Sequence, residues 1–151
     1  MKNINFHYLY RDGANYKSWG EVVFSNPDQL TMKEIESKLI DSFLPDKLFI
    51  ASQVFIPEKF LFANGKFTKF DHCYHEFDSV EICKENPTDN LNRSITDFLK
   101  TVELTSQNGW KAFDVLDRFD ILIEQTHKQA KEAGLKQKDI KSAIAKARSR
   151  K

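Results

Sequence analysis

The densest group of reactive side chains in the sequence is residues 71–78, Asp-His-Cys-Tyr-His-Glu-Phe-Asp. Cysteine, histidine and carboxylate side chains are the usual ligands of zinc. On an extended strand, Cys73 and His75 would share one face, and the other ligand types would lie on the opposite face. This spacing matches no standard zinc pattern, and we find no specific cofactor motif elsewhere. We therefore predict neither a metal site nor a cofactor.

A second polar group, residues 10–17, suggests phosphate chemistry. It contains Arg, Lys, Tyr and Asn, and Arg and Lys bind phosphate through their charge and multiple N–H donors. Combined with two residues of the first group, it gives a candidate catalytic set for a ribonuclease that needs no metal: Arg11, Lys17, His75 and Glu76. His75 or Glu76 would be the general base, and the two cations would stabilise the charged transition state. The alternative interpretation is a turn with local salt bridges such as Arg11–Asp12.

The hydrophobic pattern predicts the elements that would position these groups. Alternating or continuous apolar residues indicate strands at 3–11, 21–24, 48–56 and 72–82, with a short strand at 60–62. A capping box formed by Thr31 and Glu34 begins a helix that Pro45 ends. A second helix follows Pro87 and carries Leu91, Ile95, Phe98, Leu99 and Val102. The predicted fold class is α+β: a small, mostly antiparallel sheet with one or two packed helices.

Charge is divided unevenly along the 151 residues, although the whole chain carries only +1. Residues 128–151 hold nine basic and two acidic side chains, a net charge of +7, and the remainder holds 14 and 20, a net charge of −6. Few core-forming side chains occur in residues 103–109, and a purely helical pattern follows, interrupted at Gly134. We predict an acidic α+β domain at 1–106 and a basic helical tail at 107–151, which forms a helical hairpin.

The two tryptophans are expected in hydrophobic cores. Trp110 lies at the start of the predicted tail, where it would seal the junction between tail and domain. Trp19 lies within the predicted domain and would pack in its interior.

The tail is the predicted binding element. Within it, the residues Ile140, Ala143 and Ile144 form an apolar stripe, which requires burial and so favours docking on a protein partner. Nucleic acid is a second candidate, with phosphate contacts from Lys138, Lys141 and Lys146. However, residues 128–151 contain no aromatic side chain that could stack on bases. The opposite charges of domain and tail also allow self-association, for example a homodimer with exchanged tails.

Two resemblances extend this interpretation. The segments YRDGANYK, GEVVF, QVFIPE and DHCYHEFDSVE, within residues 4–82, resemble a recurring bacterial domain without an established activity, which implies one intact domain. Residues 130–148, AKEAGLKQKDIKSAIAKAR, resemble the toxin-neutralising C-terminal segment of type II antitoxins. That resemblance implies a docking face at Ile140, Ala143 and Ile144, and a cation, Arg148 or Arg150, that enters an acidic active site of the toxin.

Location and function follow from the same features. The chain has no run of 18 apolar residues, no signal-peptide pattern and only two cysteines, so we expect a cytoplasmic protein without membrane contact. The leading hypothesis is a regulatory, antitoxin-like protein that docks an acidic partner, such as a toxin or a defence effector. A small ribonuclease-like enzyme, less favoured, and a non-catalytic nucleic-acid-binding module are the alternatives.

Overall fold

The computed structural model describes residues 2–61, 71–118 and 128 of the chain. Within these residues, four antiparallel strands form one sheet in the order β2-β1-β4-β3. The strands are β1 (Asn3–Arg11), β2 (Lys17–Phe24), β3 (Leu48–Phe49) and β4 (His75–Cys83). The predicted α+β class and the mostly antiparallel sheet are confirmed, and the predicted C-terminal helical hairpin lies outside the described residues.

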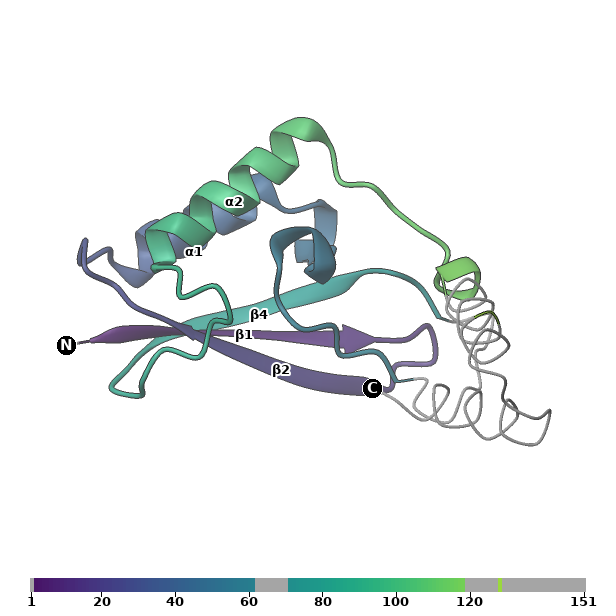
Figure 1. Cartoon of the computed structure of the whole chain (residues 1–151), viewed down its shortest axis with the longest axis horizontal. Coiled ribbons are helices and arrows are strands. Elements are labelled where there is room, and N and C mark those ends of the chain that lie inside the picture. Colours follow the sequence, from purple (N-terminus) through teal and green to yellow (C-terminus); the bar gives the residue numbers. More distant parts are fainter. Residues whose placement is uncertain (1, 62–70, 119–127, 129–151) are drawn as a thin grey trace.

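Two α-helices lie side by side on the same face of the sheet (Figure 1). They are α1 (Met32–Ser42) and α2 (Ile95–Asn108), and the 3-10 turns η1 (Pro45–Lys47) and η2 (Ala51–Val54) follow α1 in the chain. The capping box predicted at Thr31 and Glu34 begins α1 as expected. Helix α2 begins with a second capping box, formed by Ser94 and Asp97. These caps fix where each helix starts and hence which apolar residues face the sheet.

The core between the helices and the sheet is rich in aromatic side chains. Phe6 of β1 stacks on Phe77 of β4, with ring centroids 5.4 Å apart, and meets Phe98 of α2 edge-on at 5.3 Å. Phe24 of β2 stacks on Phe98 at 4.5 Å. Because Phe98 contacts rings from two strands, it ties α2 to the sheet, and burying such a side chain contributes about 2–3 kcal/mol.

The strand predicted at 48–56 is wrong beyond its first two residues. Strand β3 ends at Phe49, and the 3-10 turn η2 follows and ends at Val54; the capping residue Phe55 has a left-handed backbone with φ of 60°. Short apolar runs are buried as either strand or helix, so their hydrophobicity does not decide between the two. The segment at 60–61 is likewise not a strand. Helix α2 continues to Asn108, two residues past the predicted boundary.

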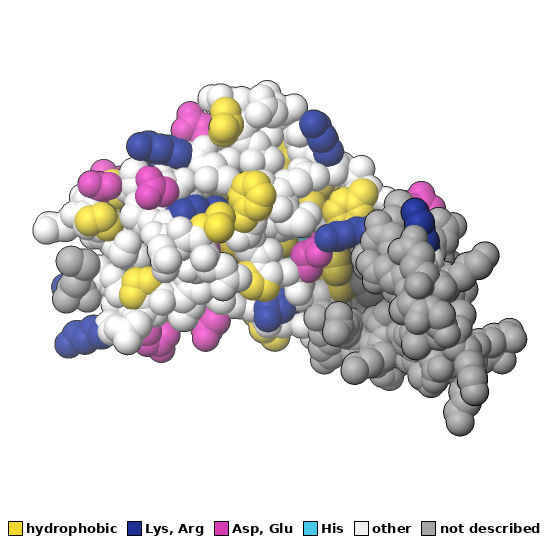
Figure 2. Space-filling view, in the orientation of Figure 1, with side chains coloured by type: hydrophobic (Ala, Val, Ile, Leu, Met, Phe, Trp, Pro, Cys, Tyr) yellow, Lys and Arg dark blue, Asp and Glu magenta, His cyan; other side chains and the backbone are white. Residues whose placement is uncertain are grey.

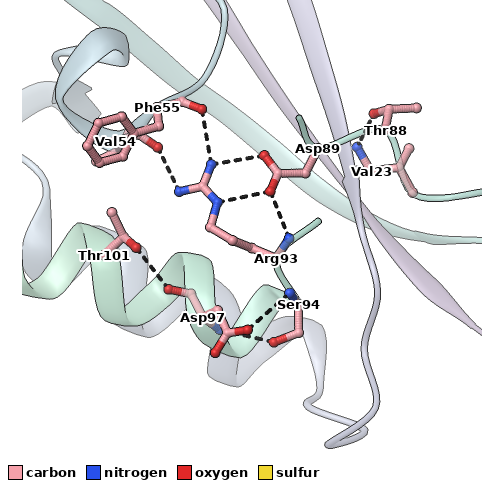
Figure 3. A network of polar contacts seen from close by, with 9 residues as sticks. All are labelled: Val23, Val54, Phe55, Thr88, Asp89, Arg93, Ser94, Asp97 and Thr101. Carbon is pink, nitrogen blue, oxygen red and sulfur yellow. Dashed lines mark hydrogen bonds and ion pairs between the residues drawn. The ribbon is translucent and has the colours of Figure 1, made fainter. Parts of the chain in front are cut away.

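A buried ion pair between Asp89 and Arg93 fastens η2 to the N-terminus of α2 (Figure 3). The guanidinium of Arg93 donates to both carboxylate oxygens of Asp89 at 2.9 Å. It also donates to the carbonyl oxygens of Val54 and Phe55. Together with the hydrogen bond from Thr105 Oγ1 to the Gln53 carbonyl at 3.4 Å, these contacts hold η2 against α2.

Gly20 provides the first testable consequence of the packing. A Cβ atom there would lie 2.7 Å from Tyr8 Cζ, and the Tyr8 ring is held by a hydrogen bond from its hydroxyl to the Pro57 carbonyl at 2.6 Å. We expect Gly20→Ala to lower the free energy of unfolding by about 1–3 kcal/mol, although glycine-to-alanine changes in strands usually stabilise. Urea denaturation measures the change. Ser18→Ala, on the same strand, is the control, and a stabilised Gly20→Ala variant would contradict the close packing.

Candidate functional site

Three of the four candidate catalytic residues lie together at one end of the sheet. Arg11 and Lys17 are directly opposite each other on β1 and β2, and Glu76 of β4 is opposite Leu9 of β1. Arg11 Nε donates to Glu76 Oε2 at 3.1 Å, so the two side chains form a partly exposed ion pair. The salt bridge that the alternative interpretation expected between Arg11 and Asp12 does not form.

The carboxylate of Asp12 instead organises the turn between β1 and β2. It accepts hydrogen bonds from the backbone amides of Ala14 and Tyr16, both at 2.9 Å. This segment therefore contains a turn stabilised by its own polar groups, which agrees with the alternative to the catalytic interpretation. The partner of Arg11 differs from the expected one.

The fourth candidate, His75, points away from the other three. Adjacent residues of a strand face opposite sides of the sheet, and His75 is only 1% exposed, on the core side. Its Nε2 accepts a hydrogen bond from the backbone N–H of Lys59 at 2.8 Å, which leaves the proton on Nδ1. Among the described residues, Nδ1 has no hydrogen-bond partner.

The surroundings of His75 keep its imidazole neutral. Four rings pack around it, with centroids 5.0–6.1 Å away: Tyr8, Tyr10, Phe49 and Phe60. The pKa of His75 is lowered to about 3, first because burial disfavours the charged ring, and then because the charges of His72 and Lys59 oppose it. The Cys73 backbone acts in the opposite direction without reversing the shift. A buried imidazole of such low pKa is poorly suited as a general base, and the structure does not bring all four candidates into one pocket.

The first four residues of the reactive group, 71–74, line a hollow of about 490 Å³ together with residues 112–116. His72 Nε2 donates to the Arg11 carbonyl at 2.7 Å, and its Nδ1 accepts from the Tyr74 amide at 3.0 Å. Both ring nitrogens are thus engaged by the backbone. Within the described ranges, no three His, Cys, Asp or Glu side chains are arranged to hold a metal ion.

The hydroxyl of Tyr10 also contacts one of the residues that line this hollow. It donates to Asp71 Oδ1 at 2.8 Å. Burial raises the pKa of Tyr10 well above its usual value, and the hydrogen bond to Asp71 acts in the same direction. Tyr10 is therefore a structural hydrogen-bond donor and not a source of a labile proton.

Residues 109–118, at the start of the predicted tail, pack on the α+β domain. Trp110 Nε1 donates to the Ser42 carbonyl at 3.0 Å, and Val115 is buried beside Ile50. Arg118 forms an ion pair with Glu58. The contacts with the domain therefore extend at least to residue 118, about ten residues beyond the composition boundary. The predicted partner-binding residues Ile140, Ala143, Ile144, Arg148 and Arg150, and the predicted nucleic-acid contacts Lys138, Lys141 and Lys146, lie outside the described residues.

The sheet face opposite the helices carries a group of side chains that the sequence did not single out. Trp19, expected in a core, is 57% exposed there, because position 19 of β2 points away from the helices. Next to it, His7 Nε2 lies 2.9 Å from Glu81 Oε1, and His7 Nδ1 lies 3.7 Å from Glu21 Oε2. Asn5 Nδ2 donates to the same Glu21 oxygen at 3.1 Å. The alternation of side chains in residues 3–11 predicts this second face. The positions of Glu21 and Glu81 on either side of His7 follow only from the register of β2 and β4 against β1.

These features define the chain as an α+β protein with a one-sided helical layer and a second, polar face. Comparisons with protein-family models, curated proteins and solved structures find no match to it. In the described part of the chain, no helix is both long and apolar enough to cross a membrane.

Proposed function

We propose that this chain is a regulatory protein-binding protein, whose basic segment 128–151 docks on an acidic protein partner in the way that antitoxins bind toxins. The observation that carries the proposal is the division of charge, −6 in residues 1–127 and +7 in residues 128–151. A segment of this charge with an apolar stripe suits an acidic protein surface that also has a hydrophobic groove.

The described domain supports a binding role over a catalytic one. A general base must lie within hydrogen-bond reach of its substrate, but His75 is enclosed by aromatic rings, and the Glu76 carboxylate is paired with Arg11. On the side of the domain seen in Figure 2, Lys and Arg side chains are interspersed with Asp and Glu and do not form a basic patch. An acidic partner would therefore be recognised by the basic segment and not by this side of the domain.

The anchoring of residues 109–118 supports a defined geometry of binding. Gln53 Nε2 donates to the Lys111 carbonyl at 2.7 Å, and the Lys111 amide donates back to Gln53 Oε1 at 3.1 Å. Together with Trp110 and Val115, this pair holds the chain before the basic segment begins. The domain would then act as a platform from which the segment reaches its partner.

Affinity capture with the full chain from its native cells, followed by titration with the partner identified, tests the proposal. The variant Lys138→Gln/Lys141→Gln/Lys146→Gln is expected to bind at least about tenfold more weakly, because each lost exposed ion pair contributes up to about 1 kcal/mol. The matched control neutralises three exposed lysines of the helical layer, Lys33, Lys38 and Lys100. Equal affinity of the variant and the control would contradict the proposal, and a partner that nuclease treatment removes would favour the nucleic-acid alternative.

A further inference from the structure

We infer that the sheet face opposite the helices is a docking site for residues 136–151 of the same chain. The strand register arranges this face in rows across β2, β1 and β4. Trp19 and Leu9 are directly opposite each other, and Leu9 is opposite Glu76. The next row contains Glu21 and His7. Leu9 is buried, so the accessible part of the first row is the Trp19 ring, which lies beside the acidic side chain of the next row.

The charge on this face is only partly compensated by the rest of the domain. Arg11 pairs with Glu76, but Glu21 and Glu81 contact only His7 and Asn5 among the described side chains. Of the three carboxylates, Glu76 is paired with Arg11, and Lys17 lies opposite Arg11 at the same end of the sheet, so the acidic excess is confined to Glu21 and Glu81 around His7. The face attracts a positively charged ligand, and the exposed ring of Trp19 adds a site for a cation over its surface.

A second observation on the same face is the side chain of Asn5. It is only 3% exposed, its Nδ2 is used by Glu21, and its Oδ1 has no partner in the described part of the chain. Because this oxygen is buried, a ligand on the face would contact Glu21 and Glu81 and not the amide oxygen, and the role of Asn5 is to hold the Glu21 carboxylate in place.

The segment 136–151 has the complementary chemistry. It carries seven basic side chains and one acidic one, and at helical spacing Ile140 and Ile144 fall on one side. The apolar side suits the exposed ring of Trp19, and the lysines suit Glu21 and Glu81. No other part of the sequence combines these two properties with such an excess of positive charge.

The point where the tail leaves the domain allows this docking within one chain. Residues 112–116 lie against residues 71–74, and His72 contacts the Arg11 carbonyl, so the tail departs from the end of β1 that faces Lys17. The eighteen residues from 118 to 136 span about 27 Å as a helix and about 60 Å when extended. A strand of nine residues such as β1 is about 30 Å long. The segment can therefore reach Trp19 and Glu21 on its own domain.

Such docking would regulate the proposed function, because an acidic partner would compete with Glu21 and Glu81 for the same lysines. Testing it requires no partner. Zero-length carbodiimide cross-linking of the purified full chain, read by mass spectrometry, is expected to join Glu21 or Glu81 to Lys138, Lys141 or Lys146. A mixture of isotopically light and heavy chains separates cross-links within one copy from those between copies.

Trp19→Ala leaves both glutamates in place and should reduce the yield of these cross-links about threefold, through loss of the apolar and cation contacts. Met32→Ala, which removes an exposed apolar side chain from α1, should leave the yield unchanged. Concentrated salt should lower the yield in the unaltered chain. Three results would each overturn the inference: cross-links only between copies, cross-links mainly to Asp41 and Glu103 of the helical layer, or equal yields from the two variants. None of these results bears on whether a separate acidic partner binds.

Discussion

Replacing Arg93 with leucine is expected to lower the free energy of unfolding by about 3–5 kcal/mol, because it leaves the buried carboxylate of Asp89 without its counter-charge. The side chains of Arg93 and Asp89 are 10% and 2% exposed. Burial alone would raise the pKa of Asp89, but hydrogen bonds and charge from Arg93 hold it below its usual value. The variant also removes the donors to the carbonyl oxygens of Val54 and Phe55. Urea denaturation followed by circular dichroism measures the loss.

The exposed pair of Arg118 and Glu58 provides the matched control for this prediction. Arg118→Leu should cost less than about 1 kcal/mol, since solvent screens an exposed ion pair. Asp89→Asn should be nearly as harmful as Arg93→Leu, and the double variant should lose clearly less than the sum of the two. Additive losses in this cycle, or a loss below 1 kcal/mol in Arg93→Leu, would mean that the pair does not hold η2 against α2.

The parts of the fold that were predictable are those whose signals are local. Alternation in residues 3–11 predicts β1, and the Thr31–Glu34 capping box predicts the start of α1, because both depend on neighbouring residues. The ion pair of Asp89 and Arg93 was not anticipated, although its spacing of four residues is visible in the sequence. No local sequence pattern indicates that Arg93 contacts η2, because its hydrogen bonds to the Val54 and Phe55 carbonyl oxygens join residues 39 and 38 positions apart.

The candidate site shows the same limit. Periodicity alone places His75 and Glu76 on opposite faces of β4, so the two could have been separated in advance. The same alternation places His75 on the side of Phe77 and Glu76 on the side of Asp78, so the enclosure of His75 was also predictable; what the sequence does not reveal is that Glu76 reaches Arg11. The pairing of Glu21 and Glu81 around His7 depends on the register of three strands and on the irregularity between His7 and Tyr8. The β1–β2 register follows from a short turn, but the β1–β4 register joins residues more than 60 positions apart and includes an irregularity that no local pattern indicates.

His75 should make the folded chain sensitive to mild acid. In the unfolded chain the imidazole titrates near its ordinary pKa of about 6.5, whereas in the folded chain its pKa is about 3. As the pH falls through 6.5, the unfolded state gains a proton that the folded state excludes, so stability is lost with decreasing pH. The loss attributable to His75 is about 2 kcal/mol between pH 7 and pH 5, and about 1.4 kcal/mol for each further unit down to about pH 3. Urea denaturation at pH 7, 6 and 5 measures it.

The comparison with His75→Gln separates this effect from the general acid sensitivity of carboxylates. Glutamine does not titrate, and its side-chain oxygen can accept the hydrogen bond from the Lys59 amide. Lost ring contacts should make this variant less stable at pH 7, yet the decrease between pH 7 and pH 5 should shrink to below about 0.5 kcal/mol. His7→Gln, on the opposite face of the sheet, should retain the full decrease. If instead His7→Gln flattened the pH profile and His75→Gln did not, the acid sensitivity would originate on the polar face and not in the core.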